Sequence, residues 1–262
     1  MSDMQVIRSR ENPHAKQLDT LLRQKKAREA SGMFVLEGAR LCLDALSAGL
    51  RPESVLLTPA ALRKNPELAA LVQEAPQTIW LDETLAERLG DTKTPQGVFA
   101  VLKMPEPATV KIHGQGRYLL LHKVRDPGNL GGILRTAAAL GVSAVFLCDC
   151  AELYSPKVLR ASMGGIFRLP VVIVDDMAAQ IQTLRQSSVE TYAAALRPGA
   201  RSTDCLSGDG AKAILIGNEG TGLPDELITA CNDCVAIPMK SGSESLNAAM
   251  AAGILMWEML RN

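Results

Sequence analysis

Three segments of the chain combine glycines with polar side chains that are able to bind an anion or move a proton. They are residues 126–132 (DPGNLGG), 217–222 (GNEGTG) and 237–247 (IPMKSGSESLN). Each follows a short apolar run that is expected to form a strand. Backbone that turns tightly and approaches a ligand closely needs glycine, so three such turns at strand ends predict one composite pocket.

Arg135 is the residue of the first segment's helix that is best suited to bind a phosphate or a developing oxyanion. The helix is expected to start at Asn129, whose side chain would cap the free amides of the first turn. Arg135 then shares a helical face with small residues such as Gly131 and Ala138, which leaves its guanidinium room to reach outward. The rigid fork of donors suits a phosphate or an oxyanion, and an ordinary salt bridge is the alternative.

The other two segments also carry polar groups that would face this pocket. Glu219 is the only carboxylate of residues 217–222, and it would either shape the loop by accepting hydrogen bonds or take part in the chemistry. The third segment leads into a helix expected from about Glu244, with Ser245 and Asn247 near the helix entrance. The apolar stripe of this helix consists of Leu246, Met250, Ile254 and Trp257.

The elements that must position these residues divide the chain near residue 110. Beyond it, short and nearly all-apolar strands are expected at residues 118–121, 144–147, 171–174, 191–195, 213–216 and 235–237, with helices between them. This alternation predicts an α/β fold with an open parallel sheet that binds ligands at the carboxyl ends of its strands. The predicted domains are residues 1–104, a smaller α/β unit, and residues 117–262, joined by a proline-containing linker at residues 105–116.

Composition restricts the class of protein. The chain has 262 residues, of which 47% are hydrophobic and 21% charged, as in globular proteins with a sizeable core. Six cysteines without regular spacing indicate reduced thiols rather than a disulfide framework. No signal segment or membrane-spanning run is recognisable in the sequence. We therefore expect a soluble, cytoplasmic protein with no membrane partner.

Standard nucleotide and metal motifs do not match this sequence. It contains no G-x-x-x-x-G-K-[ST], and its first glycine segment lacks the G-x-G-x-x-G spacing of dinucleotide-binding folds. The histidines show no metal-ligand spacing, and Cys231-x-x-Cys234 is a single pair, so no metal is expected. His122 precedes the first segment and is expected to be a strand-end histidine.

Basic side chains gather near the amino terminus, although the formal net charge of the chain is zero. Only Glu11 and Asp19 oppose them within residues 8–28. The members of this basic stripe are Arg8, Arg10, Lys16, Arg23, Lys25, Lys26 and Arg28. Such a stripe can bind RNA, because each neutralised phosphate releases counterions whatever the charge elsewhere. A solvated helix face is the alternative interpretation.

Taken in order, the motifs resemble those of a known enzyme family. The pattern D-P-G-N-x-G-x-I-x-R-T-A at residues 126–137, G-N-E-G-x-G at 217–222, and I-P-M with S-L-N within 237–247 is similar to the three motifs of the SpoU (TrmH-like) branch of the SPOUT RNA ribose 2′-O-methyltransferases. S-P-K at 155–157 and R-A-S at 160–162 also match. The first hundred residues, through N-P at 12–13 and F-x-x-E-G at 34–38, resemble the RNA substrate-binding domain of some members.

This resemblance implies an architecture, a cofactor and a set of site residues. The implied fold is a C-terminal parallel-sheet SPOUT domain with a deep trefoil knot and a smaller N-terminal α/β domain that is ribosomal protein L30e-like. A homodimer would bind S-adenosyl-L-methionine near the subunit interface. The implied cofactor-binding residues are Leu215, Gly217, Asn218, Glu219, Ile237, Met239, Ser245 and Leu246. The implied catalytic residues are Asn129, Arg135, Glu219, Ser245 and Asn247.

Three functions agree with these motifs. The first is 2′-O-methylation of structured RNA, with 23S ribosomal RNA favoured over transfer RNA, and the intact Arg135, Glu219 and Asn247 support it. The second is a catalytically silent RNA-binding or ribosome-assembly protein, and the third is a nucleotide-binding enzyme with another substrate. For 2′-O-methylation, one possible role of Arg135 is that of a general base. Because a guanidinium stays protonated, Arg135 could instead stabilise the forming alkoxide or clamp the adjoining phosphate.

Overall fold

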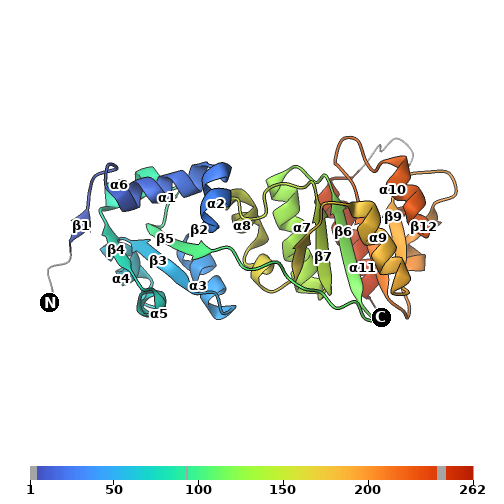
Figure 1. Ribbon diagram of the computed structural model, residues 1–262, viewed down its shortest axis with the longest axis horizontal. Coiled ribbons are helices and arrows are strands. Elements are labelled where there is room, and N and C mark those ends of the chain that lie inside the picture. Colours follow the sequence, from blue (N-terminus) through green and yellow to red (C-terminus); the bar gives the residue numbers. More distant parts are fainter. Residues whose placement is uncertain (1–4, 93, 241–245, 262) are drawn as a thin grey trace. The chain divides into compact units, whose positions relative to one another are not determined.

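The chain forms two compact units in the computed structural model, which describes residues 5–92, 94–240 and 246–261 (Figure 1). The first unit contains Met1–Pro105 together with Tyr154–Arg160. The second contains Glu106–Leu153 and Ala161–Asn262. The inclusion of Tyr154–Arg160 in the first unit is not visible in the sequence pattern, and the domain limits given above stay predictions.

The first unit is built on a mixed five-stranded sheet. Its strands are β1 (Val6–Ile7), β2 (Met33–Glu37), β3 (Pro52–Leu57), β4 (Thr78–Leu81) and β5 (Val98–Lys103), in the order β1-β4-β3-β5-β2. Strand β5 runs antiparallel to β2 and β3, whereas β1, β4 and β3 are parallel. The helices are α1 (Pro13–Arg23), α2 (Lys25–Ser31), α3 (Ala39–Ser47), α4 (Pro59–Lys64), α5 (Leu68–Glu74) and α6 (Glu83–Leu89).

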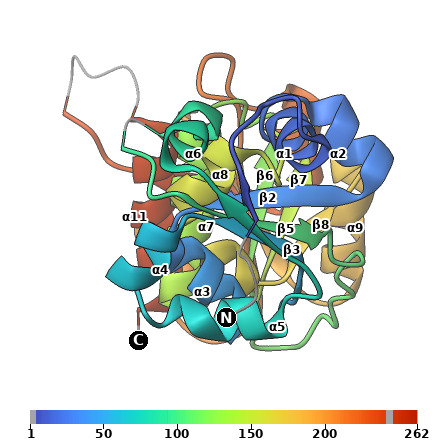
Figure 2. The same ribbon diagram turned by 90° about the vertical axis from the view of Figure 1, so that its left-hand side faces the viewer.

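Helices cover both faces of this sheet. Figure 2 shows α1, α2 and α6 on one side and α3, α4 and α5 on the other. Leu18, Leu21 and Leu81 are among the buried residues of the core under α1. Helices α1 and α2, which carry most of the basic stripe, are separated because the backbone of Gln24 is extended (φ −118°, ψ 110°).

The second unit is built on a seven-stranded sheet that is parallel throughout its described part. Its order is β10-β12-β9-β11-β6-β7-β8. The strands are β6 (Arg117–His122), β7 (Ala144–Cys148), β8 (Val171–Ile173), β9 (Glu190–Ala194), β10 (Arg201–Ser202), β11 (Lys212–Ile216) and β12 (Asp233–Ala236). The α/β class and the parallel C-terminal sheet are thus confirmed, and the trefoil knot stays a prediction.

The core of the second unit lies on both faces of the sheet. Its helices are α7 (Pro127–Leu140), α9 (Met177–Gln186), α10 (Asp225–Ala230) and α11 (Ala248–Leu260), with 3-10 turns at Gly165–Phe167 and Thr203–Leu206. Helix α8 (Pro156–Ser162) lies mostly in the segment Tyr154–Arg160, which belongs to the first unit. On one face, Tyr118 and Leu120 pack in a cluster with Ile181 of α9 and Leu227 of α10. Their sequence neighbours Leu119 and Leu121 are equally buried, as expected where helices cover a parallel sheet on both faces.

Among the described residues, no helix is both long and apolar enough to cross a membrane.

Candidate active site

The sheet brings the three glycine-containing segments to one edge. They follow β6, β11 and β12, and these strands run in the same direction. Strand β11 is hydrogen-bonded to β6 on one side and to β9 on the other, and β9 is followed by β12. Asn218 Nδ2, just beyond β11, donates a hydrogen bond of 2.8 Å to the carbonyl oxygen of Lys123, just beyond β6. The carboxyl ends of the strands therefore place the three segments side by side.

A chain of hydrogen bonds links one side chain from each segment. Asn247 Nδ2 donates to Asn129 Oδ1 at 2.9 Å, and Asn129 Nδ2 donates to Glu219 Oε1 at 3.0 Å. Asn129 thus uses both ends of its amide, which fixes the orientation of the Glu219 carboxylate. We call Asn247, Asn129 and Glu219 the polar chain. It joins three of the five residues that the resemblance implies at the reacting centre.

The start of α7 differs from the sequence expectation in a way that matters for the polar chain. The helix begins at Pro127, and its N-cap is Asp126, whose Oδ1 accepts a hydrogen bond of 2.7 Å from the backbone amide of Asn129. Asn129 therefore is not the cap that we expected. Proline favours the first position of a helix, which places the cap at Asp126 and leaves the Asn129 side chain to contact Glu219.

The start of α11 gives Asn247 two roles. Asn247 is the N-cap, and its Oδ1 accepts hydrogen bonds from the amides of Ala249 (2.9 Å) and Met250 (3.2 Å). Its Nδ2 belongs to the polar chain, so the same side chain fixes the helix start and the Asn129 amide. The helix begins at Ala248 rather than near Glu244. Ser245, expected beside Asn247, lies outside the described residues, and its role stays a prediction.

The second segment is shaped from within by Asn218. Its Oδ1 accepts hydrogen bonds from the amides of Gly220 (2.9 Å) and Thr221 (3.0 Å), and its backbone pairs with that of Gly222 in both directions. A Cβ added to Gly217 would lie 2.6 Å from backbone atoms of Gly222. The glycine at position 217 therefore allows the loop to pack against itself, and Asn218, implied as a cofactor contact, acts here on the loop.

Arg135 lies exposed on α7 and is not part of the polar chain. Six residues of helix separate it from Asn129, which corresponds to roughly 9 Å along the axis. Within the described part of the chain, its guanidinium has no ion pair and no side-chain hydrogen bond, so the salt-bridge alternative finds no partner there. The group is therefore available to an anion that approaches from outside.

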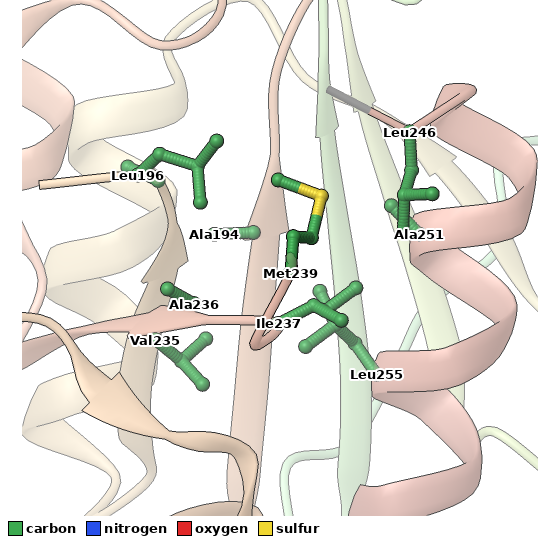
Figure 3. Close-up of a pocket in the computed structure, with 10 residues that line it drawn as sticks. Ala194, Leu196, Val235, Ala236, Ile237, Met239, Leu246, Ala251 and Leu255 are labelled. Carbon is green, nitrogen blue, oxygen red and sulfur yellow. The ribbon is translucent and has the colours of Figure 1, made fainter. Parts of the chain in front are cut away.

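An apolar pocket of about 150 Å³ lies beside the polar chain (Figure 3). Three of the implied cofactor-binding residues, Ile237, Met239 and Leu246, line it. Figure 3 shows Met239 between Leu196 and Leu246. Leu246 immediately precedes Asn247, so the apolar pocket continues into the polar chain. Such a site fits a ligand that has a flat apolar ring at one end and polar groups at the other.

The side chain of Leu215 lies in the core, and the expected contact of Leu215 with the cofactor, through its backbone, stays a prediction. It is fully buried in β11 and packs in the core with residues of α9 and α10. The strand alternates its side chains between the two faces, and Leu215 is on the face away from the third segment's pocket. It supports the sheet beneath the site, and it does not line the pocket.

The basic stripe is exposed except at one position. Arg8, Arg10, Lys16, Arg23, Lys25 and Lys26 are exposed, whereas Arg28 is only 4% exposed. Arg28 Nη1 donates to the carbonyl oxygens of Leu21 (2.5 Å) and Leu22 (3.3 Å), at the end of α1. The prediction that Arg28 binds RNA is therefore wrong for this structure, because its guanidinium is used to satisfy helix-end carbonyls.

Ion pairs reduce the net charge of the exposed stripe. Asp19 binds both Arg10 (3.0 Å) and Arg23 (2.8 Å), and Lys16 pairs with Glu11 at 2.5 Å. Lys25 faces Glu29 at 3.4 Å. Lys26 and Arg8 have no ion pair among the described residues. These pairs are exposed and contribute little to stability, so their cations can still bind phosphates.

His122 and the cysteines lie outside the polar chain. Burial lowers the pKa of His122, and the neighbouring Lys123 lowers it further, which favours a neutral ring. Burial raises the pKa of Cys150 to about 11 and that of Cys231 to about 12, so these thiols stay protonated near neutral pH. The described residues contain no group of three or more histidines, cysteines or carboxylates arranged to hold a metal ion.

Comparisons with known proteins match both parts of the chain. Residues 116–257 match the SpoU rRNA Methylase family, and residues 12–100 match the MRM3-like substrate binding domain. An uncharacterized tRNA/rRNA methyltransferase of Synechocystis sp. is 33% identical, over 99% of this chain and 95% of its own length. The 23S rRNA (guanosine(2553)-2′-O)-methyltransferase RlmP of Bacillus subtilis is 32% identical, over 98% and 99% respectively. The crystal structure of an AdoMet-bound rRNA methyltransferase from Sinorhizobium meliloti superposes with a TM-score of 0.83 at 27% identity, covering 97% of each chain.

The double role of Asn247 gives a testable expectation for stability. In Asn247→Ala, α11 loses its cap and Asn129 loses a donor, so the free energy of unfolding should fall by about 1 kcal/mol, as for other N-cap losses. Urea unfolding followed by circular dichroism measures this change. Asn247→Asp is the matched control, because its carboxylate retains the cap and lacks only the donor. An unchanged stability in the alanine variant would contradict the capping role.

Proposed function

This chain belongs to the SpoU rRNA methylase family, and we propose that it transfers a methyl group from S-adenosyl-L-methionine to a ribose 2′-hydroxyl of 23S ribosomal RNA. The observation that carries the proposal is the polar chain of Asn247, Asn129 and Glu219 beside the apolar pocket of the third segment. The relative from Bacillus subtilis acts on 23S rRNA by its name, and the Sinorhizobium meliloti enzyme was solved with AdoMet bound. Both align with nearly the whole chain.

The pocket residues fit the two ends of the proposed cofactor. Ile237, Met239 and Leu246 provide an apolar surface for the adenine ring. Asn247, next in sequence to Leu246, begins the polar side of the site, where the charged part of the cofactor would be directed. When bound, the cofactor supplies an electrophilic methyl group on a sulfonium.

The polar chain is suited to orient the reacting ribose. Asn129 holds one oxygen of the Glu219 carboxylate at 3.0 Å, which leaves further lone pairs of this group able to accept a hydrogen bond from a hydroxyl. A hydroxyl held in this way keeps its oxygen in one direction, and positioning of this kind contributes several kcal/mol to a displacement reaction, on the order of 7 or more in favourable cases.

In this proposal, Arg135 stabilises negative charge and does not accept the proton of the ribose hydroxyl. A guanidinium is effectively always protonated in proteins, so it is a poor general base. Exposed on α7 and without an ion pair among the described residues, it is able to clamp the phosphate next to the ribose or stabilise the forming alkoxide. The hydroxyl proton would then leave to the Glu219 oxygen that accepts its hydrogen bond, and from there to water.

We place a homodimer interface on the exposed stripe of α11. Met250 is 62% exposed, Ile254 37% and Trp257 57%, and they recur at helical spacing on the side of α11 that turns away from its buried residues. Leu246, which lines the pocket, is 40% exposed and precedes the same helix. Contiguous exposed apolar surface of this kind is typical of association sites. A dimer formed through this stripe would place the cofactor pocket next to the subunit interface.

The first unit would bind the RNA substrate through the exposed residues of the basic stripe. Its match to a substrate binding domain and its exposed Lys25 and Lys26 support this assignment. A ribosomal RNA substrate and bacterial relatives agree with a cytoplasmic location, which we propose as well.

Methyl transfer by the full chain is the direct test, and Arg135→Ala is its sharpest variant. With tritiated S-adenosyl-L-methionine and unmodified ribosomal RNA, wild type should label a ribose 2′-oxygen, located by mass spectrometry. Arg135→Ala should bind the cofactor normally in calorimetry and lose at least a hundredfold in rate, because loss of an electrostatic stabiliser has about this effect.

Arg135→Lys, which keeps the charge and loses the fork of donors, is the control for this variant. It should recover part of the rate. A near-normal rate in Arg135→Ala would remove Arg135 from the mechanism. Label found only in transfer RNA would show that transfer RNA, and not 23S ribosomal RNA, is the substrate. A wild-type chain that neither binds the cofactor nor transfers methyl would disprove the proposed activity.

The dimer proposal predicts the effect of charge on the exposed stripe. Trp257→Arg would bury an unpaired cation in the interface and should raise the dimer dissociation constant at least tenfold, since central aromatic residues dominate such contacts. Sedimentation equilibrium measures it, with Trp257→Phe as the conservative control. If wild type is monomeric at micromolar concentration, the stripe is not a subunit interface.

The RNA-binding role of the basic stripe predicts a change in salt dependence. Replacing Lys25 and Lys26 together with Gln should weaken RNA binding and reduce the slope of log K against log salt by about 1 to 2, because fewer counterions are released. Lys26 should contribute more, since Lys25 also faces Glu29. Filter binding at several salt concentrations measures the slope for wild type and for the double variant. Lys103→Gln is a control outside the stripe. Equal slopes in the double variant and wild type would assign the stripe to solvation.

A further inference from the structure

A second pocket, of about 340 Å³, lies wholly within the first unit. It is formed by α4 with the residues on either side of it, by α6 and by the segment that leads into β5. Its polar lining includes Lys64, Glu83, Glu87 and Gln96, and Pro95 and three alanines contribute apolar surface. The volume is in the range of small-ligand sites. We call it the first-unit pocket, and the proposed methyl transfer does not use it.

The walls of this pocket are held in place by specific contacts. Thr58, at its base, is buried, and its Oγ1 accepts a hydrogen bond of 3.1 Å from the amide of Ala61. Gly97 has φ +64°, and a Cβ there would lie 2.9 Å from Thr58 Cγ2. Gln96 Oε1 accepts a hydrogen bond of 2.9 Å from the amide of Ala39, which ties the segment before β5 to the start of α3. The pocket therefore has a defined shape before any ligand arrives.

The segment before β5 is anchored a second time, by the buried Glu37 at the end of β2. One carboxylate oxygen of Glu37 accepts from the amide of Asp91 at 3.0 Å, and the other accepts from Thr92 Oγ1 at 2.7 Å. Arg160 Nη2 pairs with the Asp91 carboxylate at 2.7 Å. Together with the Gln96 contact, these bonds fix both ends of the described segment that borders the pocket.

Among the described residues, the charged groups of the pocket have no ion-pair partner. Glu83 and Glu87 are four residues apart on α6 and therefore point to the same side of the helix. Lys64 is the last residue of α4 and also lines the pocket. In the described part of the chain, none of the three takes part in an ion pair. The two carboxylates offer only acceptors, and the ammonium group of Lys64 offers only donors.

This arrangement selects among the chemical groups of an RNA. Two neighbouring carboxylates repel a backbone phosphate, so the pocket is not a phosphate site. They match a ligand edge with several N–H donors, and Lys64 requires an acceptor on the same ligand. Of the four bases, guanine has N1–H and the exocyclic 2-amino group side by side with the O6 acceptor next to them, whereas uracil has no exocyclic amine.

We propose that the first-unit pocket binds an unpaired guanine base of the RNA substrate. This inference rests on the proposed function for its ligand class, since it takes the partner of the first unit to be RNA. The guanine N1–H and 2-amino groups donate to the Glu83 and Glu87 carboxylates, O6 accepts from Lys64, and the ring lies against Pro95 and the neighbouring alanines. Sequence-specific proteins commonly read single-stranded RNA through such bases turned out of a loop.

Inosine provides the test, because it differs from guanosine only by the missing 2-amino group. Two RNA stem–loops with uridine loops are compared, one with a single guanosine in the loop and one with inosine at the same position. In fluorescence anisotropy with the full chain and no cofactor, wild type should bind the guanosine loop about tenfold more tightly. The double variant Glu83→Ala, Glu87→Ala, which removes the acceptors, should bind both loops equally, with unchanged thermal unfolding.

Glu67→Ala is the matched control, since Glu67 is an exposed carboxylate of the first unit that does not line the pocket. It should keep the preference for guanosine. Equal binding of both loops by wild type, or a preference that survives in the double variant, would overturn the guanine site. Methyl transfer is measured separately on ribosomal RNA with the same preparations. A chain that methylates and shows no guanosine preference loses only this inference, and one that prefers guanosine and does not methylate loses only the proposed activity.

Discussion

The site of this protein depends on the Asn129 side chain, which accepts a hydrogen bond from Asn247 and donates one to Glu219. An amide does both through separate atoms, and its planar geometry sets the direction of each bond. The arrangement works because neither neighbouring loop needs Asn129 for its own support. Asp126 caps α7, and Asn218 shapes the loop that carries Glu219. Residues that support backbone are thereby separate from the residue that orients the carboxylate.

The sheet explains why these three loops meet at all. Its strands are buried on both faces, so their sequences are continuous apolar runs, and strands such as β6, β7 and β11 were predictable from the sequence within a residue or two. Parallel direction then puts the loops at one edge. The two-residue strands β1 and β10 could not be predicted, because so short a segment carries no periodic pattern.

The location of the site could be predicted from the sequence better than its details. Asp126 and Asn129 are both good caps, and only the preference of proline for the first helical position distinguishes them. Arg28 looks in sequence like the other members of the basic stripe. It is buried because α1 ends at Arg23 and presents carbonyl oxygens to its guanidinium. The sequence does not predict this helix end, because there is no glycine or proline at Gln24. The apolar stripe of α11 was visible from its spacing, but only the structure shows that Leu255 and Met256 face the core instead.

The polar chain spans 90 residues between Asn129 and Glu219 and 118 between Asn129 and Asn247. Contacts so distant in sequence form only after large loops have closed. The free-energy cost of closing these loops is offset by the strand pairing that follows. No local fragment of the second unit therefore contains the site in a working form. An intermediate in which β11 or α11 has yet to dock lacks a ligand-binding geometry, so recognition of the methyl donor marks completed folding of this unit.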